Sequence, residues 1–360
     1  MRVAVICPYS LSVPGGVQGQ VLGLAGALRA LGHDADVLGP SDGSAQPGVV
    51  SLGRSIALPA NGSVAPVALG PATALRTLRA LRHGSYDVVH LHEPLVPGPC
   101  LTAVSCTRAP MVGTFHAAGT SASYRWAGVV LARVAGRLGL RCAVSAEAAA
   151  LAARHLGGDY DVVPNGVELA RFAGAEPWPT QRPTVVFVGR HEPRKGLAVL
   201  LAALPGLPAD VEVWVVGDGP ETERLQKRSA GDDRVRWLGR LDDDELVARL
   251  AGADVLCAPS LRGESFGMVL VEAMAAGTAI VASDLPGYAA VARAGQEAVL
   301  VPAGDAEALG SALRRVLFEP DLAASLVVAG AARALELSTD RMAERYLERY
   351  EGVVRQRRGR

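Results

Sequence analysis

The sequence has few aromatic residues, no excess of either charge, no long apolar run and no ordered pattern of cysteines. Aromatic side chains make up 4% of the 360 residues and the formal net charge is zero, so no basic field indicates nucleic-acid binding. The best candidate for a membrane span, residues 126–140, is interrupted by Arg133 and Arg137. The five cysteines form no C-x-x-C pair and no metal-like spacing, which favours a reducing compartment.

The sequence also lacks a signal-peptide pattern at its start and has very few lysines. The opening "MRVAVICPYS" is typical of a buried strand followed by a turn and not of a signal peptide, because its apolar run is short. We therefore expect a cytoplasmic protein. Lysine is nearly absent, since the basic residues are arginines except for Lys195 and Lys227. The loop "RHEPRKG" holds one of these two lysines and is therefore a candidate for chemistry.

Strand and helix patterns alternate along the chain, and they do so twice. Short apolar runs such as "VAVIC" alternate with amphipathic stretches, and 360 residues exceed one typical core. This predicts an α/β protein with parallel sheets, whose ligands bind at the carboxyl ends of the strands. The prolines of "AEPWPTQRP" indicate a linker between two Rossmann-like domains that face each other across a cleft. The expected divisions are a first domain at 1–176, a linker at 177–182, a second domain at 183–339 and a final helix at 340–360 that packs back on the first domain.

Two interpretations compete for the glycine-rich segment "VPGGVQGQ", residues 13–20, which precedes a helical pattern. In the dinucleotide fingerprint G-x-G-x-x-G, Gly16 and Gly19 have the right spacing, but Pro14 occupies the place of the leading glycine. In the second interpretation, Gly15 and Gly16 form a turn that lets a sugar diphosphate approach the backbone. This segment alone leaves both open.

The strongest functional signal is "RGESFGMVLVEAMAAG". Glu264 precedes a helix that begins at Phe266, and Glu272 lies nearly two turns inside it, roughly 10 Å away along the axis. That separation suits the sugar and the ribose of one nucleotide sugar, because carboxylate oxygens accept hydrogen bonds from hydroxyls. The amides near Gly267 and Met268 lie at the helix N-terminus, which favours a diphosphate. The alternative is a capped amphipathic helix with glutamate in its first turn.

Basic and imidazole side chains follow other predicted strands. Arg190 and Lys195 flank the loop "RHEPRK", where a guanidinium and an ammonium would clamp a diphosphate without a metal. His116 ends the strand in "VGTFHAAGT", and a neutral imidazole there would hold a sugar hydroxyl. His90 and His92 end another strand and are candidates to line the same edge. A solvated basic loop and hydrogen-bonded structural histidines are the alternatives.

Two motifs are explained without a functional site. The acidic run Asp242–Glu245 has the D-x-D spacing of a metal site, but it opens a helical pattern and matches an N-cap with acidic residues in the first turn. We therefore predict no metal site. The sequon at Asn61 is no glycosylation signal in a cytoplasmic chain.

Several segments, in order from Met1 to about Pro302, carry a family resemblance. The set Arg190, Lys195, Glu264 and Glu272 resembles that of the retaining GT-B glycosyltransferases that include sucrose and trehalose-phosphate relatives. "VICPYS", "VPGGVQ", "NGSVA", "HLHEP", "GTFH", "VPNGV", "EPRKG" and "GESFGMVLVEAMAAGTAIVASDL" look like the actinobacterial phosphatidylinositol mannosyltransferases. The resemblance implies a GT-B fold and transfer of mannose from GDP-mannose to phosphatidylinositol, with no cofactor. It also implies a peripheral enzyme on the inner face of the cell membrane that retains anomeric configuration and has no assigned catalytic base.

The resemblance further implies roles for the matched positions. Glu264 holds the transferred sugar, Glu272 holds the ribose, and His116 contacts the sugar near the reacting centre. The expected donor-binding residues are Gly15, Gly16, Arg190, Lys195, Glu264, Phe266, Gly267, Met268 and Glu272. The expected acceptor-binding residues are Tyr9, Gln18, Asn61, Gly62 and Ser63. The expected catalytic residues are His116, Arg190, Lys195 and Glu264.

The sequence departs from the family pattern mostly on the acceptor side. Ser12 stands in place of an acid, Ala60 in place of a tyrosine, and Ala117–Ala118 in place of Thr-Ser. The loop "RHEPRKG" is one residue shorter than in the mannosyltransferases. Donor chemistry is therefore better supported than acceptor identity. The alternatives are the same fold with another nucleotide-hexose or acceptor, a catalytically silent sugar-nucleotide-binding regulator, and an NAD-dependent oxidoreductase, which Pro14 disfavours.

A lipid acceptor requires a docking surface, and "PATALRTLRALRHG", residues 71–84, is the candidate. Arg76, Arg79 and Arg82 recur at helical spacing, each preceded by a leucine, which predicts a basic stripe beside an apolar one. Three arginines near an anionic surface contribute roughly 3 kcal/mol before screening, enough for reversible docking. The alternative is an ordinary surface helix whose leucines pack inward.

Overall fold

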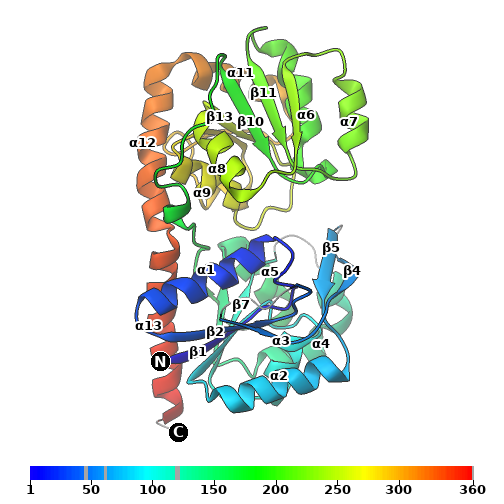
Figure 1. Ribbon diagram of the computed structural model, residues 1–360, viewed down its shortest axis with the longest axis vertical. Coiled ribbons are helices and arrows are strands. Elements are labelled where there is room, and N and C mark those ends of the chain that lie inside the picture. Colours follow the sequence, from blue (N-terminus) through cyan, green and yellow to red (C-terminus); the bar gives the residue numbers. More distant parts are fainter. Residues whose placement is uncertain (44–47, 61–62, 118–121, 359–360) are drawn as a thin grey trace. The chain divides into compact units, whose positions relative to one another are not determined.

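The computed structural model describes residues 1–43, 48–60, 63–117 and 122–358. The chain forms two compact units, the first from Met1–Gly166 with Thr339–Arg360 and the second from Val167–Ser338 (Figure 1). Residues 167–176, which the sequence analysis assigned to the first domain, lie in the second unit. The reason is local: Val167 pairs with Ser338 in a parallel bridge, so the two ends of the second unit lie side by side.

The first unit is built on a seven-stranded parallel sheet. In spatial order its strands are β3 (Val49–Ser51), β2 (Asp34–Gly39), β1 (Arg2–Ile6), β6 (Val88–His92), β7 (Met111–Phe115), β8 (Leu140–Ala143) and β9 (Asp161–Val162). A separate antiparallel hairpin joins β4 (Ile56–Ala60) and β5 (Ser63–Val67). The order reverses at β1 and β6, and such a switch point brings loops of different strands together at the carboxyl edge of a sheet.

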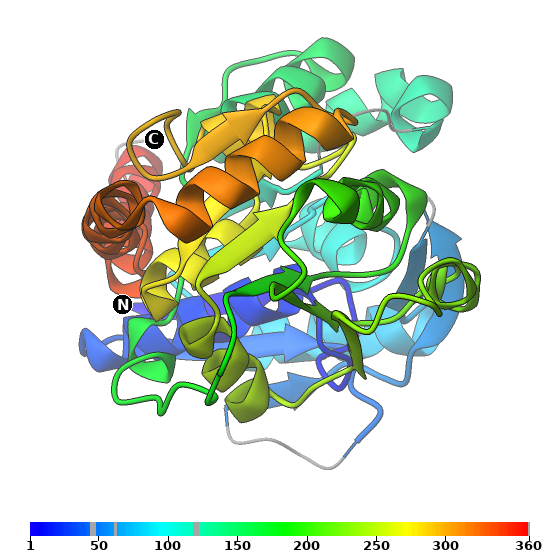
Figure 2. The same cartoon turned by 90° about the horizontal axis from the view of Figure 1, so that it is seen from above.

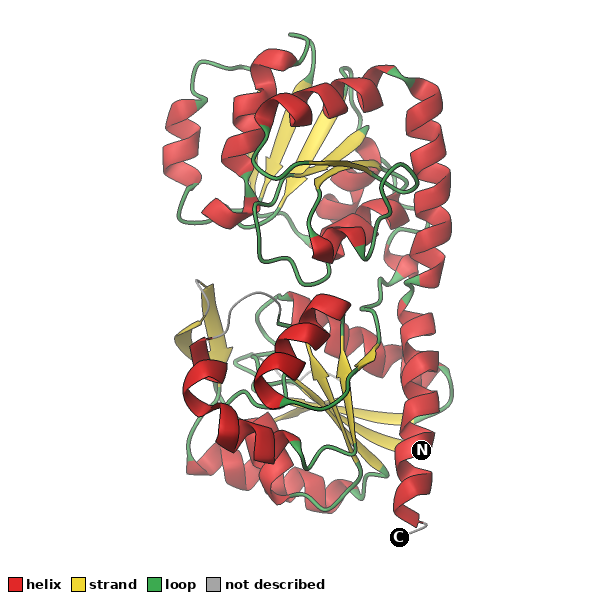
Figure 3. Cartoon of the chain, turned by 180° about the vertical axis from the view of Figure 1, so that it is seen from behind, coloured by secondary structure: helices red, strands yellow, loops and turns green. Residues whose placement is uncertain are grey.

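Helices cover both faces of this sheet, as Figure 3 shows. The alternating side chains of β1 separate two cores: Val3 and Val5 pack with one set of helices, and Ala4 and Ile6 with the other. The first set is α1 (Gly16–Ala30) and α13 (Thr339–Arg358), and the second is α2 (Pro71–Gly84), α3 (Pro99–Cys106), α4 (Ala122–Ala135) and α5 (Ala146–Leu156). Strands that are apolar on both sides are therefore buried on both sides, as parallel sheets require.

Local signals in the sequence set the ends of several helices. The chain turns out of α1 at Gly32, whose φ of +81° suits glycine, as the sequence predicts. Ser145 caps α5 by accepting a hydrogen bond from the amide of Ala148 at 3.2 Å, also as predicted. These contacts join residues that are close in sequence, so they can be predicted without the tertiary structure.

The second unit repeats the architecture with a six-stranded parallel sheet. In spatial order its strands are β12 (Val235–Gly239), β11 (Glu212–Val216), β10 (Thr184–Val188), β13 (Val255–Ala258), β14 (Ala279–Ser283) and β15 (Val299–Val301). Its α-helices are α6 (Leu197–Ala203), α7 (Thr222–Arg228), α8 (Asp243–Gly252), α9 (Met268–Ala276), α10 (Pro286–Ala289), α11 (Ala306–Phe318) and α12 (Pro320–Glu336). Helix α11 lies along β13, β14 and β15, where it closes the core (Figure 2).

The proline-rich segment predicted as a linker packs on the second unit. The guanidinium carbon of Arg249 lies 3.6 Å from the ring centroid of Trp178 and 4.6 Å from the ring centroid of Trp214. The amide of Trp178 also donates to the carbonyl of Ala248 at 2.9 Å. Cation–π contact of a largely buried arginine with both indoles fixes this segment to α8 and β11.

Candidate active site

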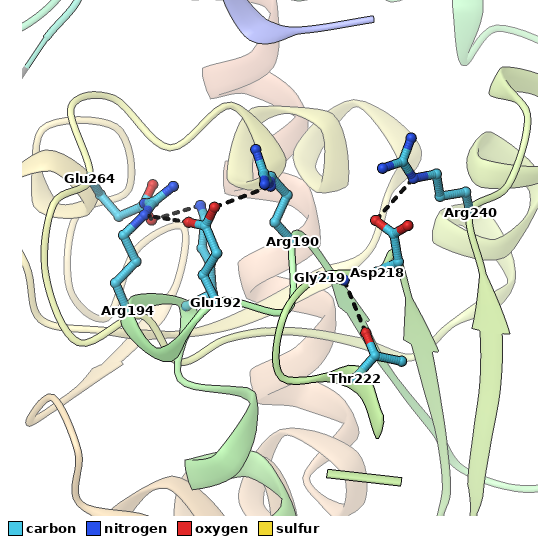
Figure 4. A network of polar contacts seen from close by, with 9 residues as sticks. Arg190, Glu192, Arg194, Asp218, Gly219, Thr222, Arg240 and Glu264 are labelled. Carbon is cyan, nitrogen blue, oxygen red and sulfur yellow. Dashed lines mark hydrogen bonds and ion pairs between the residues drawn. The ribbon is translucent and has the colours of Figure 1, made fainter. Parts of the chain in front are cut away.

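A chain of ion pairs follows strand β10 in the second unit, in the loop that the sequence analysis selected (Figure 4). The ammonium of Lys195 donates to Glu264 Oε1 at 2.7 Å, and the guanidinium of Arg194 reaches the same oxygen at 3.3 Å. Glu192, only 7% exposed, pairs with Arg194 at 2.8 Å and with Arg190 at 3.1 Å. Three cations thus share two carboxylates, which leaves a net positive charge at the carboxyl end of the sheet.

The carboxylate of Glu264 is held on one side only. Among the described residues, Lys195, Arg194 and Ser260 donate to Glu264, and all three reach Oε1. Ser260 is in turn 2.9 Å from the hydroxyl of Tyr288, which fixes its position. The second oxygen of Glu264 is therefore the one oriented for a ligand hydroxyl, while Oε1 orders the cations.

Two glycines allow the loops of this site to approach. At Gly196, φ is +70° and an added Cβ would lie 1.9 Å from the carbonyl oxygen of Pro259. The neighbouring amide of Leu261 donates to the carbonyl of Arg194 at 2.7 Å, so the loops after β10 and β13 are joined through their backbones. At Gly267, φ is +86° and an added Cβ would meet the ring of Tyr288. Only glycine fits either position without a shift of the backbone.

Helix α9 begins at Met268, two residues after the predicted start at Phe266, because Gly267 takes the N-cap position in a left-handed conformation. Phe266 is 4% exposed and packs inside the unit, so its side chain positions the turn. Glu272 lies partly buried within the helix, and burial raises its pKa while the charge of Arg171 lowers it. Arg171 also pairs with Asp243 at 3.5 Å, so two acidic groups surround one arginine beside α9.

The loops after β10 and β11 interlock. The amide of His191 donates to the carbonyl of Asp218 at 2.8 Å, and His191 Nδ1 lies 2.8 Å from the hydroxyl of Thr222. That hydroxyl accepts from the amide of Gly219 at 2.9 Å, and Asp218 pairs with Arg240 at 2.9 Å (Figure 4). Burial lowers the pKa of His191, so it is uncharged at neutral pH. The sequence analysis missed these contacts and also Glu192 and Arg194, although the last two lie inside the loop it quoted.

The acidic run at 242–245 caps a helix. Asp242 Oδ1 accepts from the amide of Glu245 at 2.9 Å at the N-terminus of α8, as predicted. Across the part of the chain that the structure describes, no group of three or more histidine, cysteine or acidic side chains is arranged to hold a metal ion.

In the first unit, histidines at the ends of β6 and β7 meet. His92 Nδ1 lies 2.9 Å from His116 Nε2, and the rings stack with centroids 5.1 Å apart. Burial lowers the pKa of both, that of His116 to about 3, so the pair is uncharged. His92 Nε2 is buried with no partner among the described residues. Because a buried N–H without an acceptor is disfavoured, His92 carries its proton on Nδ1 and donates it to His116, whose own proton is then on Nδ1.

His90, the other histidine of β6, makes structural hydrogen bonds. Its Nδ1 lies 2.7 Å from the hydroxyl of Tyr350, and its Nε2 lies 2.7 Å from the hydroxyl of Thr114. Thr114 is also 2.9 Å from the hydroxyl of Tyr346, so two tyrosines of α13 are hydrogen-bonded to the sheet. Of the two histidines of β6, His92 contacts His116 and His90 anchors the last helix.

The glycine turn at the start of α1 is open on one side. An added Cβ at Gly15 would meet the side chain of Gln18, whereas nothing lies within 4 Å of one at Gly16. Gln18 is 7% exposed and its side-chain amide points at the carbonyl of Ser10. Tyr9 is largely buried, which raises its pKa. Ser63 begins β5, whereas Asn61, Gly62 and Ala118 lie outside the described residues.

An acid that the sequence analysis did not select lies beside Ser12. The hydroxyl of Ser12 accepts from the amides of Asp42 and Gly43 at 2.9 and 3.0 Å. The carboxylate of Asp42 accepts from Ser10 and Ser55, which lower its pKa. A carboxylate is thus present next to the position where the family pattern has one, but it comes from the segment after β2.

Helix α2 presents its arginines outward, as predicted, but not a continuous leucine stripe. Arg76, Arg79 and Arg82 are exposed. Leu75 is 48% exposed, whereas the leucines at 78 and 81 are partly buried. The reason is geometric: steps of three residues at about 100° each rotate the stripe back by roughly 60° per step, so it winds into the core. No helix among the residues with described positions is both long and apolar enough to cross a membrane.

Comparison with known proteins gives a consistent result. Residues 14–171 match the family Glycosyltransferase Family 4, and residues 182–319 match Glycosyl transferases group 1. The chain is 42% identical over 363 residues to the phosphatidyl-myo-inositol mannosyltransferase of Mycolicibacterium smegmatis, covering 98% of this chain and 94% of the relative. A protein of the same name from Propionibacterium freudenreichii is 42% identical over 311 residues, covering 80% and 78%.

Solved structures agree with the fold. Sucrose-phosphate synthase from Thermosynechococcus elongatus has a TM-score of 0.79 at 22% identity, with 98% of each chain covered. An Anabaena protein in complex with UDP and glucose has a TM-score of 0.76 at 18% identity, covering 98% and 100%. The fold class expected from the sequence, α/β of the GT-B type with two Rossmann-like domains, is therefore confirmed.

Proposed function

Because the chain belongs to the glycosyltransferase family that includes the phosphatidyl-myo-inositol mannosyltransferases, we propose that it transfers mannose from GDP-mannose to phosphatidylinositol. The observation that carries the proposal is the 42% identity over 98% of the chain. The cationic loop after β10 supports it, because a nucleotide sugar brings a diphosphate that such a loop would bind.

In the proposed donor site, the diphosphate lies against Lys195, Arg190 and the amides at the start of α9. When Lys195 turns from Glu264 to a phosphate, Oε1 of Glu264 is released as a further acceptor for the sugar hydroxyls, in addition to the second oxygen of the carboxylate. Glu272 holds the ribose. The glycine turn at Gly15 and Gly16 gives the diphosphate room to approach.

In the proposed reaction, the bond between sugar C1 and the diphosphate oxygen breaks while C1 bonds to the oxygen of the acceptor hydroxyl on the same face, and the proton of that hydroxyl passes to the departing diphosphate oxygen. Negative charge grows on the leaving diphosphate, where Arg190 and Lys195 stabilise it, and we assign no metal to this step. His116, uncharged and held by His92, contacts the sugar near the reacting centre. We assign no catalytic base.

The proposed acceptor lies in a membrane, so the protein is placed at the inner face of the cell membrane as a peripheral enzyme. Helix α2 is the proposed docking element, since Arg76, Arg79 and Arg82 are all exposed. Leu75 on the same helix is 48% exposed and would enter the interface. Tyr9, Gln18 and residues 61–63 are proposed to bind the acceptor.

The proposal is tested by thermal-shift measurements with GDP-, UDP- and ADP-sugars, followed by mass spectrometry of lipid products made with the sugar that binds. We expect GDP-mannose to raise the unfolding temperature and to yield mannosylated phosphatidylinositol, with turnover preserved in EDTA. Stabilisation by UDP-sugars but not by GDP-sugars would overturn the donor assignment. Complete loss of turnover in EDTA would overturn the metal-free step.

A further inference from the structure

A buried carboxylate that the proposed reaction leaves without a task holds the loop that carries His116. Glu93 directly follows β6 and is 7% exposed. Its Oε1 accepts a hydrogen bond from the backbone amide of His116 at 2.7 Å, and the amide of Ala117 is a second donor to the carboxylate. The main chain of Glu93 continues the ladder between the two strands, since its own amide donates to the carbonyl of Thr114 at 2.8 Å.

The backbone of Glu93 is unusual for a residue with a side chain. Its φ is +48°, and Ser85 is the only other non-glycine residue with positive φ among the described positions. A left-handed conformation at such a residue persists where surrounding contacts enforce it. The carboxylate of Glu93 contacts backbone amides in the loop after β7, and these contacts supply such a restraint. The backbone conformation of Glu93 and the position of its side chain therefore depend on each other.

Among the groups around it, Glu93 is the one that changes charge near neutral pH. Tyr9 after β1 and Cys100 on α3 face it, and burial raises the pKa of both, so they stay uncharged. Burial lowers the pKa of His92 and of His116, so these are uncharged as well. Burial raises the pKa of Glu93 to about 7, while the two amide hydrogen bonds lower it in part.

We propose that Glu93 is a positioning residue: its ionised carboxylate fixes the backbone of His116 and Ala117 and thereby sets the imidazole of His116 against His92. The inference rests on the proposed function only in giving His116 a role in transfer. Hydrogen bonds to an ionised acceptor are about twice as strong as those to a neutral one, so protonation loosens the loop. Turnover should therefore rise with pH through about 7, while donor binding in the second unit should not follow this profile.

The first test needs neither donor nor acceptor. Hydrogen–deuterium exchange, resolved to the amides of His116 and Ala117 and corrected for intrinsic rates, is measured at pH 6 and pH 8. We expect protection to be about tenfold lower at pH 6 in the wild type, and equally low at both pH values in Glu93→Gln. Equal protection of the wild type at both pH values would overturn the proposal. Should the variant not fold, this wild-type comparison decides by itself.

The second test compares kinetics with a matched control. Glu297 is also a buried glutamate, 1% exposed, that accepts a backbone amide at 2.7 Å, here from Arg293 in the second unit. Glu93→Gln should lower kcat about tenfold at pH 8 and abolish the rise near pH 7, with GDP affinity unchanged. Glu297→Gln should keep the wild-type pH profile.

The outcomes separate this inference from the proposed function. If Glu93→Gln loses activity but keeps the pH profile of the wild type, its role is merely structural and the proposal is wrong. If the wild type transfers no mannose to phosphatidylinositol but shows the exchange difference, the positioning role of Glu93 holds and the proposed function fails. If mannose is transferred and Glu93→Gln matches the wild type in every measurement, the proposed function holds and the positioning role of Glu93 is wrong.

Discussion

In the second unit, the loop after β10 and Glu264 carry charged side chains that pair with one another, whereas His92 and His116 at the sheet edge of the first unit are buried and uncharged. Lys195, 20% exposed, reaches Glu264 across two loops. His116 and His92, in contrast, form a neutral pair inside the sheet edge. An ion-pair network suits a charged ligand that can exchange partners with it. A buried neutral pair of histidines suits an uncharged ligand group, such as a sugar hydroxyl, that is positioned by a hydrogen bond.

Two carboxylates, one from each unit, affect stability in opposite directions as the pH changes. Hydrogen bonds from Arg234 lower the pKa of Asp232 in the second unit, so its contribution to stability is present above its unfolded value of 3.8 and is lost as the pH falls. Burial raises the pKa of Glu93 in the first unit from 4.5 to about 7, so the free energy of unfolding decreases as the pH rises through that window. Mild acid therefore favours the protonated form of Glu93 in the folded unit but weakens its hold on His116.

The substitution with the largest expected effect is His116→Ala in the first unit. We expect turnover to fall roughly 100-fold, because a polar contact near the reacting centre is lost, while nucleotide affinity stays nearly intact. Steady-state kinetics and calorimetric titration with GDP measure the two effects. A variant that transfers mannose at the normal rate would show that the reacting centre is not beside His116.

The complementary change in the second unit is Lys195→Ala. Losing a charge-assisted contact should weaken diphosphate binding by about 1.5 to 3 kcal/mol, roughly 10- to 100-fold in Kd. Lys227→Ala, an exposed lysine on α7, is the matched control and should bind GDP as the wild type does. Equal affinity in both variants would remove Lys195 from the donor site.

A third change separates docking from chemistry within the first unit. Replacing Arg76, Arg79 and Arg82 together by serine should weaken binding to anionic vesicles about tenfold at physiological salt, after screening. Transfer to a membrane-embedded acceptor should slow, and turnover with a short-chain soluble acceptor should survive.

The control for docking carries the same change of net charge in the second unit. Arg228, Arg314 and Arg315 are exposed there and are replaced by serine. Vesicle sedimentation at low and physiological salt should show wild-type binding for this control. If the α2 variant also binds vesicles like the wild type at low salt, another surface docks.

The smallest expected effect tests whether Asp242 caps a helix or holds a metal. Asp242→Ala should lower the free energy of unfolding by about 1 kcal/mol, because the amide of Glu245 loses its acceptor. Turnover should stay within twofold of the wild type. Loss of activity that added divalent metal restores would show that the acidic run is a metal site after all.

Much of the fold follows from contacts between residues close in sequence. The alternation of apolar and amphipathic runs predicts both parallel sheets, and Gly32, Ser145 and Asp242 mark helix ends by local backbone chemistry. The same holds for the proposed donor residues, since Lys195 and Glu264 lie in motifs that are complete within single loops. Periodicity alone misplaces the leucines of α2, because a three-residue spacing drifts around a helix.

The sequence by itself therefore determined the α/β class, several helix ends and the candidates Arg190, Lys195 and Glu264 of the proposed donor site, because each depends on neighbours a few residues away. The tertiary structure alone decided that Lys195 and Glu264 pair with each other, that Glu93 holds the backbone of His116, and that His90 anchors α13 through Tyr350. These contacts join residues that are remote in sequence. They form only once the order of strands in each sheet has placed the ends of different strands beside one another, and no local pattern encodes that order.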